Sequence, residues 1–132
     1  MAKSPLKPTE VELSILRVLW GRGRPLTVRD VHASLSKDKD TAYTTVLKML
    51  TIMTDKGLVC RDESERSHTF VPAHSEARVQ ASMLRDFLKR AFAGSPLSLM
   101  QRALDERLAS EQDLAEMEKL IARARAKRKD RQ

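Results

Sequence analysis

Hydroxyl and ammonium groups recur between positions 44 and 51 at a spacing that gathers them on one side of a helix. Thr44, Lys48 and Thr51 stand three or four residues apart, whereas Val46 and Leu50 fall on the opposite side at about 100° per residue. Threonine hydroxyls can bond to base edges, and a lysine can reach a guanine or a phosphate. The pattern predicts a DNA-reading face, and it is equally typical of a solvated face on an ordinary packed helix.

Residues beside this face and in the segment that follows could add contacts. Leu47, on the flank of the same helix, can pack on a thymine methyl group. Further along, Arg61, Arg66, Ser67 and His68 can contact phosphates or the minor groove, whereas the acidic residues between them would be repelled by DNA. We expect a ribbon that approaches a nucleic acid through its basic side and turns its carboxylates away.

Capping pairs and apolar spacing predict the elements that position these residues. Thr9 with Glu12, and Thr27 with Asp30, have the spacing of a capping box at a helix start. Gly57 supplies a left-handed stop after the helix that carries the candidate face. In chain order we expect a helix that starts at Thr9 and is stopped by Gly21 and Gly23, an extended link at 25–26, and a short helix after Thr27. A polar connector at 36–40, a helix over 41–56, and hairpin strands at 58–61 and 67–71 follow.

The second half of the chain predicts three amphipathic helices with narrow apolar faces. Ser95 with Pro96, and Ser110 with Asp113, are the start signals of the last two helices. Such faces bury little surface alone, so we expect two copies of the segment to share one core. The predicted dimerisation residues from the three helices are Leu84, Phe87, Leu88, Ala91, Leu97, Met100, Leu104, Leu114, Met117 and Ile121.

Composition limits the classes of protein. The 132 residues are 41% apolar and 33% charged, with a net charge of +7 that suits a polyanionic partner. Most of the excess lies in the last eleven residues, which we expect to form a solvated basic tail. Cys60 is the single cysteine, and the chain shows neither a signal peptide nor an apolar run long enough for membrane insertion, so we expect a cytoplasmic protein.

Catalysis has weak support in this sequence. His32, His68, His74 and Cys60 are the usual imidazole and thiol candidates, and no spacing among them resembles a zinc or a Cys-His signature. A glycine-rich phosphate loop is also absent from the sequence. We therefore expect no enzyme, no cofactor and no metal site.

Four motifs, in order and spacing, resemble the penicillinase-repressor family of bacterial transcription factors. They are Pro8-Thr-Glu-Val-Glu, Thr41-Ala-Tyr-Thr-Thr-Val-Leu-Lys-Met-Leu, Lys56-Gly-Leu-Val and Arg66-Ser-His. The resemblance implies a mainly α protein with a small β-hairpin: an N-terminal winged helix-turn-helix joined to a C-terminal helical dimerisation region. It also implies repression by a homodimer bound to palindromic operators, with beta-lactam-resistance or stress genes as possible targets.

The resemblance completes the set of candidate site residues. It places Tyr43, Thr44, Thr45, Leu47 and Lys48 on a recognition helix and Arg66 to His68 on a wing, and outward geometry adds Thr51. It leaves open a membrane sensor-protease pathway as a partner, although Arg102-Ala103 stands where drug-resistance members carry the Asn-Phe bond that is cut. The copper-responsive members' cysteine-rich metal motif is not found here.

The sequence therefore predicts three parts and two competing functions. The parts are a winged-helix domain at 1–73, a helical dimerisation region at 74–125, and a basic, disordered tail at 126–132. The first function is a sequence-specific repressor that binds double-stranded DNA. The alternative is a nonspecific nucleic-acid-binding or protein-interaction module driven by the tail and the helical half.

Overall fold

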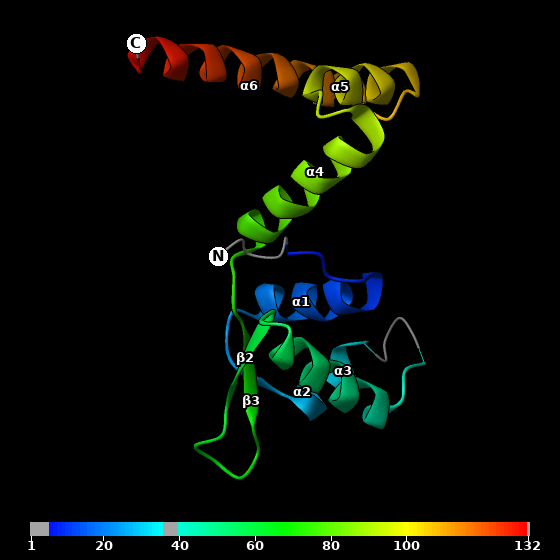
Figure 1. The fold of residues 1–132 in the computed structure, drawn as a ribbon, viewed down its shortest axis with the longest axis vertical. Helices are drawn as coiled ribbons and strands as arrows, with labels where there is room; N and C mark the ends of the chain where they lie inside the picture. The colour runs from blue at the N-terminus through cyan, green and yellow to red at the C-terminus, as the bar shows by residue number, and fades with distance from the viewer. Residues whose placement is uncertain (1–5, 36–39, 132) are drawn as a thin grey trace. The chain divides into compact units, whose positions relative to one another are not determined.

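The computed structural model describes residues 6–35 and 40–131. They form two compact units, divided between Asp86 and Phe87. Both ends of the chain and most of the predicted connector at 36–40 lie outside the described residues. Figure 1 shows the order of the elements along the chain. Each unit is described by itself below.

Helix α1, Glu10–Arg22, begins as the sequence predicts, and of the two predicted glycine stops Gly23 ends it whereas Gly21 lies inside it. The Oγ1 of Thr9 accepts from the N–H of Glu12 at 3.2 Å, and the carboxylate of Glu12 accepts from the N–H of Thr9 at 2.8 Å. These two bonds satisfy donors that a helix start otherwise leaves unpaired. Gly23 ends the helix in the left-handed conformation, φ 66°, which costs glycine little.

A two-residue strand and two helices follow α1. Strand β1, Leu26–Thr27, leads directly into α2, Val28–Leu35, and the Thr27–Asp30 pair makes both reciprocal bonds of a capping box at 3.1 Å. Helix α3, Tyr43–Asp55, buries Val46, Leu50 and Met53 on one side. These burials confirm the inward face that the sequence predicts.

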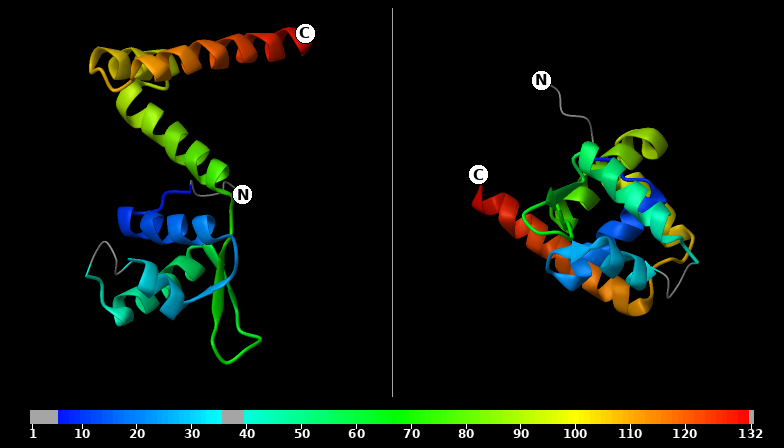
Figure 2. Two further views of the ribbon diagram at one scale, coloured as in Figure 1. Left: turned by 180° about the vertical axis from the view of Figure 1, so that it is seen from behind. Right: turned by 90° about the horizontal axis from the view of Figure 1, so that it is seen from below.

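Strands β2, Val59–Asp62, and β3, Thr69–Pro72, form the predicted hairpin. The sheet has a third member, because β1 pairs antiparallel with β3 and the strand order is β1-β3-β2. The sequence predicts only an extended link at β1. The β2–β3 turn projects beyond the helices in the two side views (Figures 1 and 2). Three helices with such a ribbon confirm the winged-helix fold.

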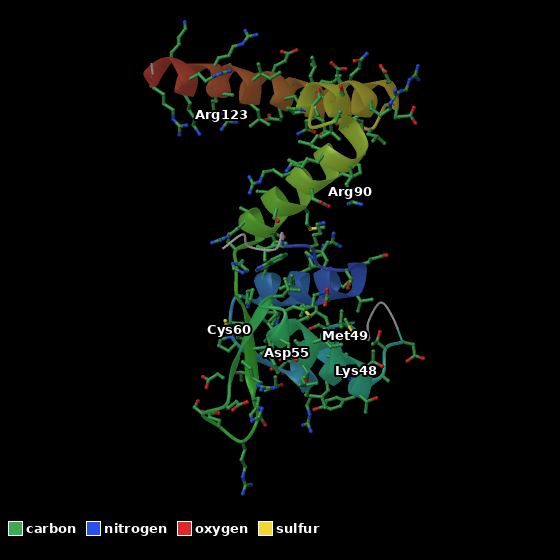
Figure 3. All side chains as sticks on the ribbon, in the orientation of Figure 1. Lys48, Met49, Asp55, Cys60, Arg90 and Arg123 are labelled. Atoms are coloured by element: carbon green, nitrogen blue, oxygen red, sulfur yellow. The ribbon has the colours of Figure 1, made fainter. Side chains whose placement is uncertain are left out.

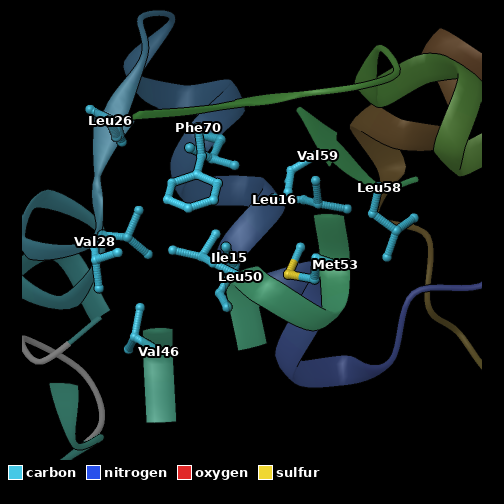
Figure 4. Packing of buried hydrophobic residues seen from close by; sticks show 12 residues of the cluster. Ile15, Leu16, Leu26, Val28, Val46, Leu50, Met53, Leu58, Val59 and Phe70 are labelled. Atoms are coloured by element: carbon cyan, nitrogen blue, oxygen red, sulfur yellow. The ribbon is translucent and has the colours of Figure 1, made fainter. Parts of the chain in front are cut away.

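The core of the first unit joins all of these elements (Figure 4). Side chains from the three helices meet Leu26 of β1, Val59 of β2 and Phe70 of β3, each 2% exposed or less. Val79 of α4, Glu76–Phe92, is also buried. The β2–β3 hairpin, residues 59–72, is called the wing below. Because α1, α3 and the sheet share this core, the outward side of α3 is held at a fixed angle to the wing.

The second unit contains the end of α4 and two further helices, α5, Pro96–Asp105, and α6, Glu111–Asp130. The predicted caps are present: Ser95 Oγ accepts from the N–H of Ser98 at 3.1 Å, and Ser110 with Asp113 forms a capping box. No residue of α5 or α6 is buried. The helices are stable at their ends but leave their apolar sides open.

The end of the chain differs from the prediction. Helix α6 continues through Asp130, so most of the segment 126–132, for which the sequence predicts a disordered tail, is helical. A capped start, several alanines and cations near the negative end of the helix dipole favour this continuation. The predicted division at residues 73 and 125 stays a prediction. None of the helices in the described part of the chain is long and apolar enough to cross a membrane.

Candidate nucleic-acid interface

The outward side of α3 carries the first group of candidate residues. Tyr43, Thr44, Thr45, Leu47 and Lys48 are exposed, as is Thr51, whose hydroxyl donates to the carbonyl oxygen of Leu47 at 2.9 Å. Tyr43 and Leu47 keep 46% and 45% of their surface open, so both side chains are accessible to a partner. Figure 3 labels Lys48 on α3. This side mixes hydroxyl, apolar and cationic groups in the way that base edges require.

An open groove of about 500 Å³ runs between the start of α2, the outward side of α3 and the wing. It brings together candidates from two distant segments of the chain. The predicted residues that line it are Tyr43, Leu47, Thr51, Arg66, Ser67 and His68. Thr44 and Lys48 lie on the exposed side of α3 outside the groove lining, and Thr45 lines a separate small apolar recess together with Val11 and Met49.

The groove also contains residues from β1, α2 and β2. Thr27 is the last residue of β1, Arg29 lies in the first turn of α2, and Arg61 comes from β2. The sequence analysis includes Arg61 among the wing cations but does not single out Arg29 as a site residue. No local pattern could have found Arg29, because its position depends on how α2 packs beside α3. The lining contains three arginines and no carboxylate, so its electrostatic potential favours an anion.

Two acidic residues of the wing, Asp62 and Glu63, bind to neighbouring residues of the wing. Glu63 binds Arg61, with Oε1 2.8 Å from Nε, and Asp62 accepts from the N–H of Ser64 at 2.9 Å. The Ser64 N–H holds the pKa of the Asp62 carboxyl below its usual value. Within the described residues Arg66 has no ion-pair partner, so its guanidinium remains available for a phosphate.

The start of α3 is braced by an aromatic contact. The ring of Tyr43 meets the ring of His32 edge to face, with centroids 5.7 Å apart and an interplanar angle of 73°. His32 also bonds through Nε2 to the carbonyl oxygen of Thr41 at 2.8 Å. Helix α3 lacks a side-chain cap at Ala42. His32 therefore contributes to the position of the first turn of α3, where several candidate residues stand.

The end of α3 is tied to the start of α1 by an ion pair. The Nζ of Lys56 donates to both carboxylate oxygens of Glu12, at 2.8 and 3.0 Å, and the Glu12 side chain is 1% exposed. Burial raises the pKa of the Glu12 carboxyl, but the Lys56 ammonium and the Thr9 N–H and hydroxyl outweigh it, so that the pKa lies below its ordinary value of 4.5. The pair fixes the tilt of α3 from its far end.

The predicted dimerisation residues lie mostly on open surfaces. Leu97 is 75% exposed, and Leu84, Phe87, Leu104 and Ile121 are between 39% and 47% exposed. Phe87 meets Phe92 edge to face at 5.6 Å. The remaining predicted residues divide into the exposed Ala91 and the half-buried Leu88, Met100, Leu114 and Met117. The assignment of this surface to a partner copy stays a prediction.

Together, the helices, the three-stranded sheet and the basic groove beside α3 define a winged-helix protein. The sequence model of one family, described as penicillinase repressor, matches residues 8–123. The chain belongs to the penicillinase repressor family. The resemblance found in the four sequence motifs is thereby confirmed.

Individual relatives match a shorter part of the chain. Two proteins called "Transcriptional regulator BlaI", from Mycobacterium tuberculosis strains CDC 1551 / Oshkosh and ATCC 25618 / H37Rv, are 37% identical over 82 residues. The match covers 62% of this chain and 59% of each relative. A solution structure of monomeric Bacillus licheniformis BlaI in complex with the blaP half-operator aligns with a TM-score of 0.49 and 22% identity, covering 58% of this chain and 93% of that chain.

Proposed function

We propose that this protein is a transcriptional repressor that reads duplex DNA through α3 and contacts the flanking phosphates through the wing. The observation that carries the proposal is the groove in which Tyr43, Leu47 and Thr51 of α3 face Arg66 to His68 of the wing. An α-helix fits the major groove, and the basic ribbon beside it can follow the DNA backbone. Membership of the penicillinase repressor family supports the same function.

We assign the side chains of α3 to base edges and the arginines of the groove to phosphates. Thr44 and Lys48, exposed on the outward side of α3, are the residues we assign to base edges, with Leu47 against a thymine methyl group. Arg29, Arg61 and Arg66 are assigned to phosphates, because guanidinium groups bind phosphate in a bidentate manner. Binding requires Arg61 to exchange Glu63 for a phosphate, which the exposure of this ion pair permits.

We further propose that the repressor is a homodimer on a palindromic operator, with the second unit as the dimer interface. The support is the apolar surface that α5 and α6 leave open, where no residue is buried in the single chain. Two recognition helices on one face of the duplex, about one helical turn apart, would double the contacts of one half-site. Occupancy of a promoter by this dimer would exclude RNA polymerase in the cytoplasm.

The signal that releases the repressor from DNA is a separate question from how it binds. A membrane sensor-protease remains the family-based hypothesis for induction. Arg102 and Ala103, at the place of the family's cleaved bond, lie inside α5, where Arg102 is exposed and faces Asp105 at 4.0 Å. Exposure of the intact protein to such a protease, followed by mass determination, would show whether a bond in α5 is cut.

A selection from random duplex DNA at near-physiological salt tests the proposed function. We expect the retained sequences to share an inverted repeat, and the protein to prefer that repeat over random duplex by about 10³-fold or more. Recovery of unbiased DNA, with affinity that collapses uniformly with salt, would replace the proposal with a nonspecific binder. If the protein retained no DNA at all, the result would favour the alternative function, a protein-interaction module that acts through the helical half.

A further inference from the structure

The second half of α6 differs in kind from the first. Up to Ile121 the helix carries an apolar stripe and acidic residues; from Ala122 onward the only apolar side chains are alanines. The segment 122–131, called here the basic end of α6, holds six cations and one acidic residue, Asp130. The cations are Arg123, Arg125, Lys127, Arg128, Lys129 and Arg131.

These cations are exposed and unpaired in the described part of the chain. None of them makes a hydrogen bond or an ion pair through its side chain, whereas Lys119, one turn earlier, binds Glu116 at 3.2 Å. Several lie four residues apart, such as Arg123 with Lys127, and like charges at this spacing destabilise a helix. Figure 3 shows Arg123 on α6. An anionic partner would relieve this repulsion.

The pattern excludes two common uses of a basic helix. At about 100° per residue the six cations spread over roughly 240° of the circumference. The remaining arc holds only Ala122, Ala126 and Asp130, so no large apolar side chain is left to enter a core. A helix that lies on a membrane needs large apolar residues such as leucine or tryptophan on one face, and the basic end has none. Its chemistry fits a partner whose negative charges approach from several sides.

The acidic half of α6 in a second copy is a weaker candidate for that partner. Asp113 already accepts from the N–H of Ser110 at 3.0 Å, and Glu116 already binds Lys119. Glu111 lies in the first turn, where the helix dipole stabilises it. The phosphate backbone of a duplex, in contrast, offers a dense row of unpaired anions and gains from arginine-rich contacts.

We infer that the basic end of α6 is a second DNA-binding element, which holds phosphates of the duplex outside the bases read by α3. The inference rests on the proposed function, because the same DNA must be engaged by the first unit. A flexible or fixed link between two contacts raises the effective concentration of the second. The basic end therefore adds affinity and salt dependence and adds no sequence preference.

The test compares three full-length proteins: the parent, a variant with all six cations changed to Gln, and a control with the four arginines changed to Lys, which keeps the charge. Each is titrated against a long duplex that contains the selected operator, a duplex cut to the operator, and a long random duplex. Affinities are measured between about 50 and 200 mM salt, because each phosphate contact contributes about 0.9 to the slope of log K against log[salt]. Sedimentation equilibrium measures the fraction of each protein that is dimeric.

On both long duplexes we expect the slope of log K against log[salt] to be shallower for the Gln variant than for the parent, by about 2 or more. On the cut duplex the slope should change little, and the Lys control should match the parent on every duplex. An unchanged slope on the long duplexes would overturn the inference. A weaker dimer in the Gln variant, with an unchanged slope, would overturn it in favour of the acidic half of a second copy. The proposed function is tested separately, by the ratio between operator and random duplex in the parent.

Discussion

Lys48 is the single residue whose loss should report most directly on base reading. Its ammonium is exposed on the outward side of α3, in a helix whose other side is packed in the core. We expect Lys48→Ala to weaken operator binding by about 1–3 kcal/mol, roughly 5- to 150-fold, with the fold and the proposed dimer unchanged. Fluorescence anisotropy with the selected operator measures this loss.

A matched control for Lys48 stands on α1. Arg17 is also an exposed cation of the first unit, but it lies on α1 and not on the outward side of α3. Arg17→Ala removes the same charge and should change operator affinity by a much smaller factor. If Lys48→Ala binds as well as the parent, the outward side of α3 is not the reading face.

Glu12 is the residue whose chemistry should appear in the pH dependence of stability. The carboxylate is buried against Lys56, and its pKa lies below the ordinary 4.5. Such a group contributes stability above pH 4.5, and this contribution is lost as the pH falls through the folded-state pKa. We expect Glu12→Gln to lower the free energy of unfolding by about 1–3 kcal/mol at neutral pH.

Urea denaturation followed by the fluorescence of Trp20, the single tryptophan, measures this effect. The stability difference between the parent and Glu12→Gln should narrow as the pH falls from 4.5 through the folded-state pKa. Protons then bind the Glu12 carboxylate first in the unfolded chain and, at the lower pKa, in the folded protein. Glu10→Gln, an exposed first-turn glutamate of the same helix, is the control and should show little change. A difference that stays constant with pH would mean that the ion pair contributes nothing.

Residue roles were predictable where periodicity decides them. The alternation of Val46 and Leu50 with Thr44 and Lys48 is a property of one helix, so the sequence was sufficient to identify the buried and exposed sides. The Glu12–Lys56 pair joins positions 44 residues apart, and the sequence offers only a capping role for Glu12. Its second function depends on the packing of α1 against the end of α3.

Gly57 is the turn on which the connection from α3 to the wing depends. It has φ 79°, and the next N–H, that of Leu58, donates to the carbonyl oxygen of Met53 at 2.9 Å. A Cβ at this position would meet no atom within 4 Å, so the cost of a side chain is purely conformational. We expect Gly57→Ala to destabilise the first unit by roughly 1–2 kcal/mol.

Gly21 provides the comparison for Gly57. It lies inside α1, its φ is not positive, and an added Cβ would also meet no atom within 4 Å. Gly21→Ala should raise stability by about 0.5–1 kcal/mol, because alanine loses less conformational entropy in a helix. Trp20 fluorescence in urea compares the two variants. Equal effects at the two positions would show that the left-handed turn is not a constraint.

Elements with local start and stop signals were predicted, and the third strand was not. The capping boxes and the glycine stops act within a few residues, and the structure confirms them. Strand β1 is two residues long and becomes a strand only through Phe70 and Thr69 of β3, more than 40 positions away. A pairing of this kind is determined by tertiary packing, which local propensity does not contain.

At the scale of the whole molecule, the exposed apolar side chains of the second unit are the main support for the proposed interface with a second copy. Leu97 and Leu108 are each 75% exposed, and α5 and α6 have no buried residue. Exposed large apolar side chains that gather in one region of a chain often mark an interaction site. The sequence could predict the stripes, because they follow helical spacing, but not how two copies would pack in the proposed dimer, because a single chain does not contain those contacts.

Leu88, near the end of α4, tests whether dimerisation and DNA binding are coupled. We expect Leu88→Asp to convert the dimer to a monomer in sedimentation equilibrium, because a carboxylate in an apolar interface is costly to desolvate. Operator affinity should then fall by about 10² or more, since a single half-site supplies too few phosphate contacts at physiological salt. Gln101→Asp, at an exposed polar position of α5, adds the same charge and should leave both properties unchanged. A Leu88→Asp monomer that keeps full operator affinity would show that one recognition helix suffices, and the palindromic dimer would have to be abandoned.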